Sequence, residues 1–321
     1  MVNTTYLMPW AMRVEGPLDV GALEEALTCL VARHESLRTT FPIIDSSPVQ
    51  EVREAEPLRL KVDDVSGDPE RLYSLMDEEM HVGFDLANGP LFRAVLYALG
   101  PAEHVLLLLQ HHIISDAWSL DITIRELGLL YDDAVNKRES TLPELPVQYR
   151  DYSRWMRESM QGEALEQQLE YWSSQLAGAP QVLDLPTDRP RPPMESHNGA
   201  LYSFNISRKV RDGITEIGRR EGTTLFTILL AALDLLLWRY TGQEDLLVGV
   251  PIANRDREDI EGLIGLFVNT LVIRNDLSGN PTVKEILARV NERCLDAYAH
   301  SQLPVETLVE HMNPARDLSR N

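Results

Sequence analysis

The sequence predicts a mixed α/β fold (α+β in its element order) that is divided into two lobes. Its 321 residues suggest one large domain or two packed lobes rather than a single small core. Helical and strand patterns alternate on both sides of one proline-rich stretch, which indicates two α/β lobes. A composition of 44% hydrophobic and 25% charged residues excludes collagen-like, coiled-coil and disordered chains. We therefore expect an N-terminal lobe over residues 1–176, a linker over 177–197 and a C-terminal lobe over 198–321.

In the first lobe, start signals and apolar spacing define the expected elements. Asp19 precedes apolar residues at helical spacing, and Pro69 opens a second helix. The dipeptide Gly100-Pro101 separates two apolar, β-rich runs and predicts a hairpin. The expected strands are residues 11–15, 50–53, 58–62, 91–99 and 103–113, and the expected helices are residues 19–32, 69–80, 119–136 and 149–176.

The second lobe begins after a segment that breaks regular structure. One glycine and five prolines crowd residues 177–197, which marks an irregular linker. Beyond it we expect strands over residues 201–206, 246–250 and 267–274, and helices over residues 208–221, 224–240 and 282–300.

Charge and cysteine content restrict the partners and the compartment. The net charge is −20 and no basic stripe occurs, which argues against nucleic acid. Cys29 and Cys294 form no CxxC motif, so we expect a reducing, cytoplasmic environment. The N-terminus lacks the pattern of a signal peptide. The longest strongly apolar run, residues 104–114, is too short for a membrane span. We expect neither a nucleic-acid nor a membrane partner.

The sharpest local feature is His111-His112 followed by Asp116, at the end of an apolar strand. Side chains alternate along a strand, so the two histidines face opposite ways. Two interpretations stay open from these residues alone. The histidines and the turn aspartate are structural groups, as is common at strand ends and helix caps, or they form a catalytic site. A zinc site is disfavoured, because the histidines diverge and no third ligand lies at a fitting interval.

Six segments, in order, resemble the motifs of nonribosomal peptide synthetase condensation domains. HHIISDAWS at 111–119 resembles their HHxxxDG signature, whose HxxxD part is shared with other acyltransferases. The other five are RHESLRTTF at 33–41, YRDYSRW at 149–155, IGLFVNT at 264–270 followed by Arg274, HSQLPVE at 300–306 and RDLSRN at 316–321. The resemblance implies two chloramphenicol-acetyltransferase-like lobes, each a mixed sheet flanked by helices, in a V-shaped pseudo-dimer.

The chain departs from the family pattern in three ways. The first family motif is absent before Met1, and the family continues beyond Asn321, so the resemblance implies a domain truncated at both ends. Ala117 replaces the glycine of the signature. If that position has a positive φ, alanine costs about 1 kcal/mol; if the glycine keeps space open, the methyl group narrows the channel. The backbone N–H of Ala117 is retained in either case.

The resemblance implies an acyltransferase that forms amide bonds. The substrates are a donor acyl or peptidyl thioester and an acceptor aminoacyl thioester, both carried on phosphopantetheine arms of carrier proteins. It implies an adjacent adenylation domain, no directly bound cofactor and no metal. The catalytic residue is His112, for which we favour hydrogen bonding to the amine and acceptance of its proton during attack. A strict general base that removes the proton beforehand stays open.

The other site residues take supporting roles. His111 is expected to face the core and support the turn. Asp116 is expected to be structural and to pair with an arginine of the second lobe, first of all Arg255, whose alternative is a solvated loop charge. Arg38 and Tyr152 are treated as structural. The remaining positions expected near the channel are Ala117, Trp118, Ser119, Asn269 and Thr270, although Trp118 equally fits a packing role.

Two rival functions remain. An epimerisation domain or a free-standing HxxxD acyltransferase shares the histidine signature, but IGLFVNT and HSQLPVE favour amide formation. A truncated, non-catalytic remnant or carrier-docking module would expose unpaired strand edges and apolar surface.

Overall fold

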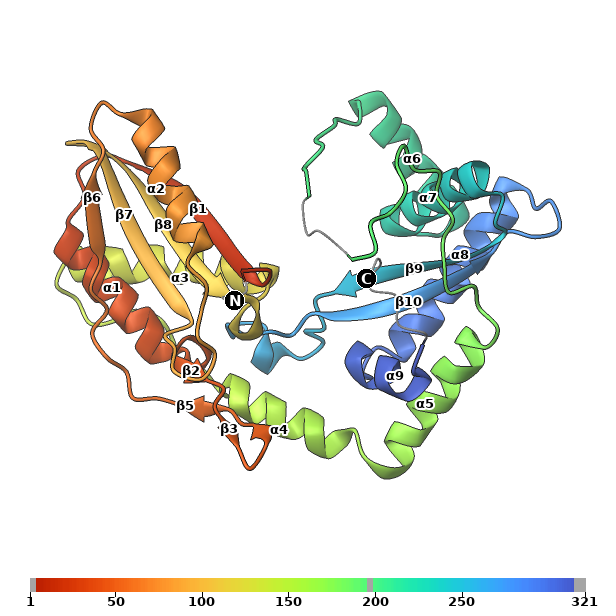
Figure 1. Ribbon diagram of the computed structural model, residues 1–321, viewed down its shortest axis with the longest axis horizontal. Helices are drawn as coiled ribbons and strands as arrows, with labels where there is room; N and C mark the ends of the chain where they lie inside the picture. Colours follow the sequence, from red (N-terminus) through yellow and green to blue (C-terminus); the bar gives the residue numbers. More distant parts are fainter. Residues whose placement is uncertain (1–3, 195–198, 315–321) are drawn as a thin grey trace. The chain divides into compact units, whose positions relative to one another are not determined.

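The computed structural model describes residues 4–194 and 199–314 and has a mixed α/β fold, as predicted. The chain divides into two compact units (Figure 1). Unit 1 comprises Met1–Glu158 and Arg255–Phe267, and unit 2 comprises Ser159–Asn254 and Val268–Asn321. These units differ from the expected lobes at two places. Residues 159–176 group with unit 2, and the segment Arg255–Phe267, here called the crossover segment, groups with unit 1.

Unit 1 is built on a four-stranded sheet with the strand order β1-β8-β7-β6. The strands β7 and β8 form the expected antiparallel hairpin, β1 pairs antiparallel with β8, and β6 pairs parallel with β7. Their bounds are Leu7–Glu15 for β1, Lys61–Asp64 for β6, Phe92–Gly100 for β7 and Glu103–His111 for β8.

The central strand β8 explains why the sequence shows an uninterrupted leucine run. Leu106 and Leu108 pack in the cluster that contains α1 (Val20–Arg33) and α3 (Ala117–Val135). Leu107 and Leu109 pack in a second cluster with Leu72 of α2 (Pro69–His81). Successive side chains enter opposite faces of a strand, and here helices cover both faces (Figure 1). The strand therefore carries no polar alternation.

Short elements and one helix complete unit 1. Two-stranded pairs join β2 to β5 and β3 to β4. The additional elements are η1 (Glu35–Arg38), β2 (Thr39–Thr40), β3 (Ile43–Ile44), β4 (Ser47–Pro48), β5 (Glu51–Val52), η2 (His112–Ile114), α4 (Tyr149–Ser159) and η3 (Glu258–Ile260).

Unit 2 contains a two-stranded antiparallel sheet and five helices among its described residues. Its elements are α5 (Gly162–Leu176), α6 (Arg208–Glu221), α7 (Leu225–Thr241), β9 (Asp245–Ile252), β10 (Asn269–Asp276), α8 (Val283–Ala299) and α9 (Val305–Met312). The core joins Trp172 of α5 to the strands and to α8, and the Trp172 indole donates to the His300 carbonyl over 3.1 Å. A capping box between Thr282 and Glu285 begins α8.

Three sequence expectations need correction. The expected helix over residues 149–176 is two helices, and Gly162, at the start of the second, has a φ of +55°. The expected strand over 201–206 is irregular, and Leu201 is 94% exposed. No partner strand lies beside it among the described residues, and backbone groups without such a partner do not form a ladder. The expected strand over 58–62 begins later, at Lys61.

Some expectations lie beyond what the structure describes. The RDLSRN motif and the last part of the linker, residues 195–197, are outside the described residues. Among the described helices, no single one is long and apolar enough to cross a membrane. The pair α6 and α7 passes that test only when joined, across a bend of 106°.

Candidate functional site

The histidine pair lies at the boundary between β8 and the turn η2. His111 is the last residue of β8, and its N–H donates to the Leu91 carbonyl over 3.0 Å. His112 begins η2, and its N–H donates to the Tyr6 carbonyl over 2.8 Å. Hydrogen bonds to Leu91, just before β7, and to Tyr6, just before β1, thus fix the backbone of both histidines.

The His111 side chain closes the turn. Its Nδ1 accepts a hydrogen bond from the Ile113 N–H over 3.1 Å, so the neutral ring carries its proton on Nε2. The ring lies 6.1 Å from the rings of Tyr6 and of Phe84, measured between centroids. Burial, followed by the neighbouring His112, lowers the pKa of His111. These contacts hold the His111 ring against the turn, and the residue is half-buried, like His112, rather than enclosed in the core.

His112 is half-buried, so its imidazole is not sealed inside apolar packing. Its Nδ1 is buried and has no hydrogen-bond partner among the described residues. The same is true of the Ser115 hydroxyl and of both amide atoms of Gln110, two residues that are fully buried. Several polar groups on either side of His112 are therefore unpaired, which is uncommon for buried groups and typical of sites that hold a ligand or water.

Asp116 is the N-cap of α3, and among the described residues no hydrogen bond or ion pair joins its carboxylate to His112. Its carboxylate accepts hydrogen bonds from the Ser119 N–H over 2.8 Å and from the Ser119 hydroxyl over 2.7 Å. It also accepts one from the Phe267 N–H over 3.0 Å. Arg255 Nη2 lies 3.2 Å from Asp116 Oδ1. The carboxylate is fully engaged, as expected for a structural role.

Arg255 makes the contact expected from the sequence, but as part of unit 1. Its side chain is 1% exposed, so it is not a solvated loop charge. Its Nη1 donates to the carbonyls of Ile260 and Leu263 over 2.8 and 2.7 Å. The guanidinium carbon lies 3.9 Å from the centroid of the Phe267 ring. Arg255 thereby holds both ends of the crossover segment and the start of α3.

Further contacts anchor the middle of the crossover segment. The Ser36 hydroxyl donates to the Ile264 carbonyl, and the Tyr149 hydroxyl donates to the Leu266 carbonyl, each over 2.7 Å. A Cβ atom at Gly265 would lie 2.2 Å from the Tyr149 ring, so the close approach requires glycine. Three of the resembling motifs therefore meet at this segment.

A buried hydrogen bond between His34 and Glu126 was not foreseen. His34 Nε2 lies 2.7 Å from Glu126 Oε2, and both side chains are nearly inaccessible. Burial is the main cause that lowers the pKa of His34, while hydrogen bonding to His34 helps to lower that of Glu126. The available signal was the position of Glu126, four residues after Ile122 and four before Leu130 on the buried face of α3.

The remaining expected residues separate into exposed and buried groups. Ala117 is exposed, is the first residue of α3 and has no positive φ, so it carries no backbone strain. Trp118 is 46% exposed and donates to the Glu261 carbonyl. Ser119 is fully buried and cannot line a channel. Asn269, in unit 2, donates to the carbonyls of Ser301 and Leu303.

Arg38 and Tyr152 were expected to be structural. Arg38 donates to the Arg53 carbonyl, and Tyr152 packs against Phe267 with ring centroids 4.6 Å apart. No group of three potential metal ligands occurs among the described histidine, cysteine and acidic residues.

Comparisons with known proteins place these features in a family. The family model described as a condensation domain matches residues 2–321. A linear gramicidin synthase of Brevibacillus parabrevis is 45% identical over 322 residues, and the match covers 99% of this chain and 6% of that relative. Chondramide synthase cmdD of Chondromyces crocatus is 42% identical over 324 residues, with coverage of 99% and 8%. The chain thus spans less than a tenth of these relatives.

A solved structure has a closely similar fold. The X-domain in a complex with OxyB, from teicoplanin biosynthesis, superposes with a TM-score of 0.91 at 33% sequence identity. The match covers 98% of this chain and 70% of that one.

Proposed function

Because this chain belongs to the condensation-domain family found in nonribosomal peptide synthetases, we propose that it joins two carrier-bound acyl groups through an amide bond. The donor is an acyl or peptidyl thioester, and the acceptor is an aminoacyl thioester. Each arrives on the phosphopantetheine arm of a carrier protein, with an adenylation domain nearby to load the acceptor. The reaction needs no resident cofactor or metal.

The observation that carries the proposal is the half-buried His112 in a turn whose backbone is fixed on both sides. In the proposed reaction, the acceptor amine attacks the donor carbonyl, a C–N bond forms and the C–S bond breaks. His112 accepts one proton from the attacking amine and returns it to the departing sulfur, so the free arm leaves as a thiol. Asp116 and Arg255 act as positioning residues that fix α3 and the crossover segment.

We favour proton acceptance during attack over prior deprotonation. A free α-amino group has a pKa of about 7.7–8.0, and the adjacent thioester lowers it, so much of the nucleophile is already neutral near pH 7. Orientation of the amine then matters more than its deprotonation. If His112 served only to remove the proton beforehand, the His112→Ala variant would recover its rate as the pH rises past 8. Under our proposal the rate of this variant stays low.

The test is amide formation between two loaded carrier proteins, followed by mass spectrometry of the dipeptidyl thioester. We expect His112→Ala to lower the rate by about 10²–10⁴-fold, the usual contribution of an acid–base group. The matched control is His81→Ala on α2, where the exposed imidazole pairs with Asp77 outside the site. Equal rates for wild type and His112→Ala would refute the role of His112.

A second candidate function is a docking module without catalysis. The similarity to an X-domain solved together with OxyB favours it, because that domain forms a complex with another protein. Binding of carrier proteins without any amide product from the wild-type chain would support this alternative.

A further inference from the structure

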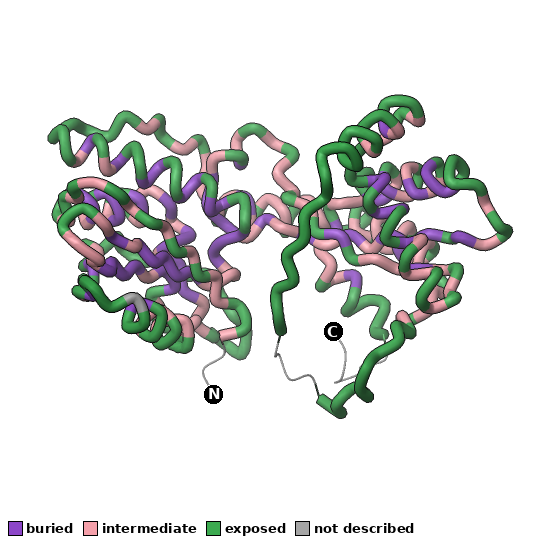
Figure 2. Tube along the Cα trace, turned by 90° about the horizontal axis from the view of Figure 1, so that it is seen from above, coloured by how far each residue is buried: buried purple, intermediate pink, exposed green. Residues whose placement is uncertain are grey.

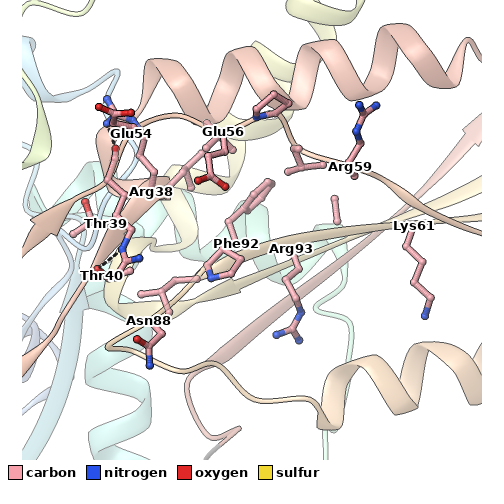
Figure 3. A pocket seen from close by; sticks show the side chains of 18 of the residues that line it. Arg38, Thr39, Thr40, Glu54, Glu56, Arg59, Lys61, Asn88, Phe92 and Arg93 are labelled. Atoms are coloured by element: carbon pink, nitrogen blue, oxygen red, sulfur yellow. Dashed lines mark hydrogen bonds between the residues drawn. The ribbon is translucent and has the colours of Figure 1, made fainter.

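The edge of the unit 1 sheet is incomplete beside the start of β7. β7 begins at Phe92, but its outer neighbour β6 begins at Lys61, which pairs with Val95. Among the described residues, no strand therefore lies beside the first residues of β7 on this side. Residues 53–60, here called the strap, cross this stretch instead, and a cavity of about 500 Å³ separates them from β7 (Figure 3). This volume is in the size range of ligand sites.

The strap is bound to α1 and not to β7. The Leu58 N–H donates to the Thr28 hydroxyl over 3.0 Å, and the Leu60 N–H donates to the Glu24 carboxylate over 2.8 Å. Both acceptors belong to α1. No backbone hydrogen bond joins the strap to the described residues of β7. The strap therefore does not complete the sheet, and the outer edge of β7 is open to the cavity.

The alternation of hydrogen bonds along β7 shows which backbone groups face the cavity. The Leu91 carbonyl accepts a hydrogen bond from β8 over 3.0 Å, and the Ala98 carbonyl accepts one over 2.9 Å from Val65, directly after β6. In an antiparallel pair, the N–H and C=O groups of alternate residues point toward the partner strand. Odd-numbered residues of β7 thus pair with β8, whereas Phe92 and Ala94 direct their backbone groups toward the cavity.

These outward backbone groups are buried but unpaired. Phe92 is 3% exposed and Ala94 is 7% exposed. Pairing with β6 starts at Val95, so it reaches the Ala94 carbonyl but neither the Ala94 N–H nor the backbone of Phe92. Buried backbone N–H and C=O groups almost always have a hydrogen-bond partner. The cavity therefore presents two donors and one acceptor at the spacing of a β-ladder, which an added strand would pair.

The two sides of this open edge differ in chemistry. Phe92 and Arg93 extend to opposite sides of β7 (Figure 3). On the Phe92 side, the cavity is lined by apolar residues of the main core cluster, among them Val31, Leu37 and Leu58. A strand beside β7 would direct successive side chains to these two sides in turn. An apolar side chain fits the first side, and Arg93 decides what fits the second.

Arg93 is a cation without a carboxylate partner. Its Nη groups donate to the carbonyls of Glu79, Val82 and Gly83 at the end of α2. Its Nε is buried and has no hydrogen-bond partner among the described residues, and no described carboxylate forms an ion pair with it. An incoming carboxylate would accept a hydrogen bond from this unused N–H and balance the charge.

The acidic residues around the cavity do not pair with Arg93. Glu79 pairs with Lys61 over 2.7 Å. Glu54 and Glu56 extend from the strap, on the other side of β7 (Figure 3). A positive cavity in a protein with a net charge of −20 favours an acidic ligand. The lining has more cations than carboxylates: Arg38, Arg53, Arg59, Lys61 and Arg93 against Glu54, Glu56 and Glu79.

We propose that the open edge of β7 binds an extended peptide segment of a partner protein as an added strand. The peptide backbone pairs with Phe92 and Ala94, one side chain packs on the apolar side, and the next, an aspartate or glutamate, binds Arg93. Valine and isoleucine fit the flanking positions, because they are apolar and favour an extended backbone. The recognised segment is thus an acidic residue between β-branched apolar ones. This site recruits a partner and takes no part in the proposed amide formation.

The first test measures binding of labelled, end-blocked pentapeptides to the full chain by fluorescence anisotropy. The reference sequence is Thr-Val-Glu-Val-Thr, and its variants carry Gln or Lys in place of Glu. We expect the Glu peptide to bind about tenfold more tightly than the Gln peptide, the lower end for a hydrogen bond to a charged group, and the Lys peptide to bind most weakly. Arg93→Gln should abolish the preference for Glu over Gln. Arg59→Gln, in the strap at the same cavity, is the matched control and should leave it unchanged.

The second test examines strand pairing on the wild-type chain, so it does not depend on the folding of Arg93→Gln. N-methylation of the two valines blocks the N–H groups on one edge of the peptide, and N-methylation of the glutamate and the last threonine blocks those on the other edge. We expect one pattern to abolish binding and the other to be tolerated. Binding of the unmodified peptide should also protect the amides of Phe92 and Ala94 from hydrogen exchange.

Failure of the Glu peptide to bind at millimolar concentration would overturn the inference. Equal losses for the two methylation patterns would show that the peptide does not pair as a strand. An unchanged preference for Glu in folded Arg93→Gln, or an equal loss in Arg59→Gln, would place the carboxylate away from Arg93. Exchange protection confined to segments outside residues 91–95 would place the whole peptide elsewhere. Each of these results contradicts the proposal.

Discussion

Asp116 of unit 1 and Asp234 of unit 2 are both buried carboxylates, but their surroundings differ. Asp116 is 2% exposed and accepts hydrogen bonds from a serine side chain and two backbone N–H groups, beside the Arg255 guanidinium. Asp234 is fully buried, and Oδ2 accepts one hydrogen bond from the Asn275 amide over 2.7 Å, while Oδ1 has no partner among the described residues. The buried carboxylate of Asp116 thus lies beside a cation, whereas the hydrogen-bond partner of Asp234 is a neutral amide.

The two units also differ in how completely their apolar side chains are covered. In unit 1, helices cover both faces of the sheet (Figure 1), and the buried residues, drawn in purple in Figure 2, include residues of β7 and β8 and of α1 and α3. In unit 2, α7 exposes an apolar stripe, and residues 201–206 carry four exposed apolar side chains. The stripe comprises Leu225, Leu229, Leu233, Leu236 and Tyr240. A soluble helix that is apolar on all sides is normally buried, so the packing of unit 2 is less complete than that of unit 1.

The largest expected effect is the loss of stability when the ion pair between Asp116 and Arg255 is broken. Arg255→Ala leaves Asp116 buried without its cation, and removal of one partner of a buried pair costs about 3–5 kcal/mol. The control is Arg257→Ala in the same segment, where the pair with Asp259 is partly exposed and contributes at most about 1 kcal/mol. Urea unfolding measures both. A cost below about 1 kcal/mol for Arg255→Ala would contradict the central position of this ion pair.

The buried carboxyl group of Asp234 should make the stability of unit 2 depend on pH. Burial raises the pKa of Asp234 from 3.8 to about 6, so the folded state holds a proton that the unfolded state has already released. This contribution to stability is complete below pH 3.8 and is lost as the pH rises through about 6. The difference corresponds to about 3 kcal/mol, at about 1.4 kcal/mol for each pH unit.

Asp234→Asn tests this directly, because it removes the titration and keeps an oxygen that can accept from Asn275. Unfolding free energies of both proteins are compared from about pH 5 to about pH 8, a range that brackets the raised pKa. The variant should become progressively more stable than the wild type as the pH rises. A constant difference over this range would show that Asp234 does not titrate there.

The third prediction compares two leucines on α7. Leu230 is 4% exposed, whereas Leu233 is 40% exposed. Leu230→Ala should cost about 2 kcal/mol, the lower end for a buried leucine, because the incompletely covered helix can relax around the cavity. Leu233→Ala should change the free energy of unfolding by about 0.5 kcal/mol or less. Equal costs would mean that the stripe on α7 is covered in solution.

The two units also explain which sequence predictions succeeded. In unit 1, local signals and tertiary packing agree: Asp19 caps α1, Gly100-Pro101 turns the β7–β8 hairpin, and the leucine run is a strand buried on both faces. In unit 2, the alternation over residues 201–206 predicted a strand, but a strand requires a neighbour, which a local pattern does not provide.

The predictions about the site likewise succeeded for some contacts and failed for others. Resemblance to family motifs was sufficient to pair Asp116 with Arg255, 139 residues apart. It did not show that the crossover segment packs in unit 1, or that Glu126 pairs with His34. The position of Glu126 on the buried face of α3 indicates a buried carboxylate, but no local pattern identifies His34 as its partner. The need for glycine at position 265 likewise depends on a ring, Tyr149, that approaches from α4.

The smallest expected effect on stability concerns Gln110, a buried polar residue of unit 1 whose side chain, unlike that of Asp116, is not hydrogen-bonded to any described residue. This side chain is fully buried in β8, and neither its carbonyl oxygen nor its amide nitrogen has a hydrogen-bond partner among the described residues. An unpaired buried polar group costs about 1–3 kcal/mol, and an apolar replacement of similar size removes that cost. Gln110→Leu should therefore raise the free energy of unfolding by about 1 kcal/mol. The control is Asn275→Leu in unit 2, which removes the partner of Asp234 and should destabilise the protein. If Gln110→Leu also destabilises, its amide is hydrogen-bonded in solution, and the polar atoms around His112 belong to a connected network.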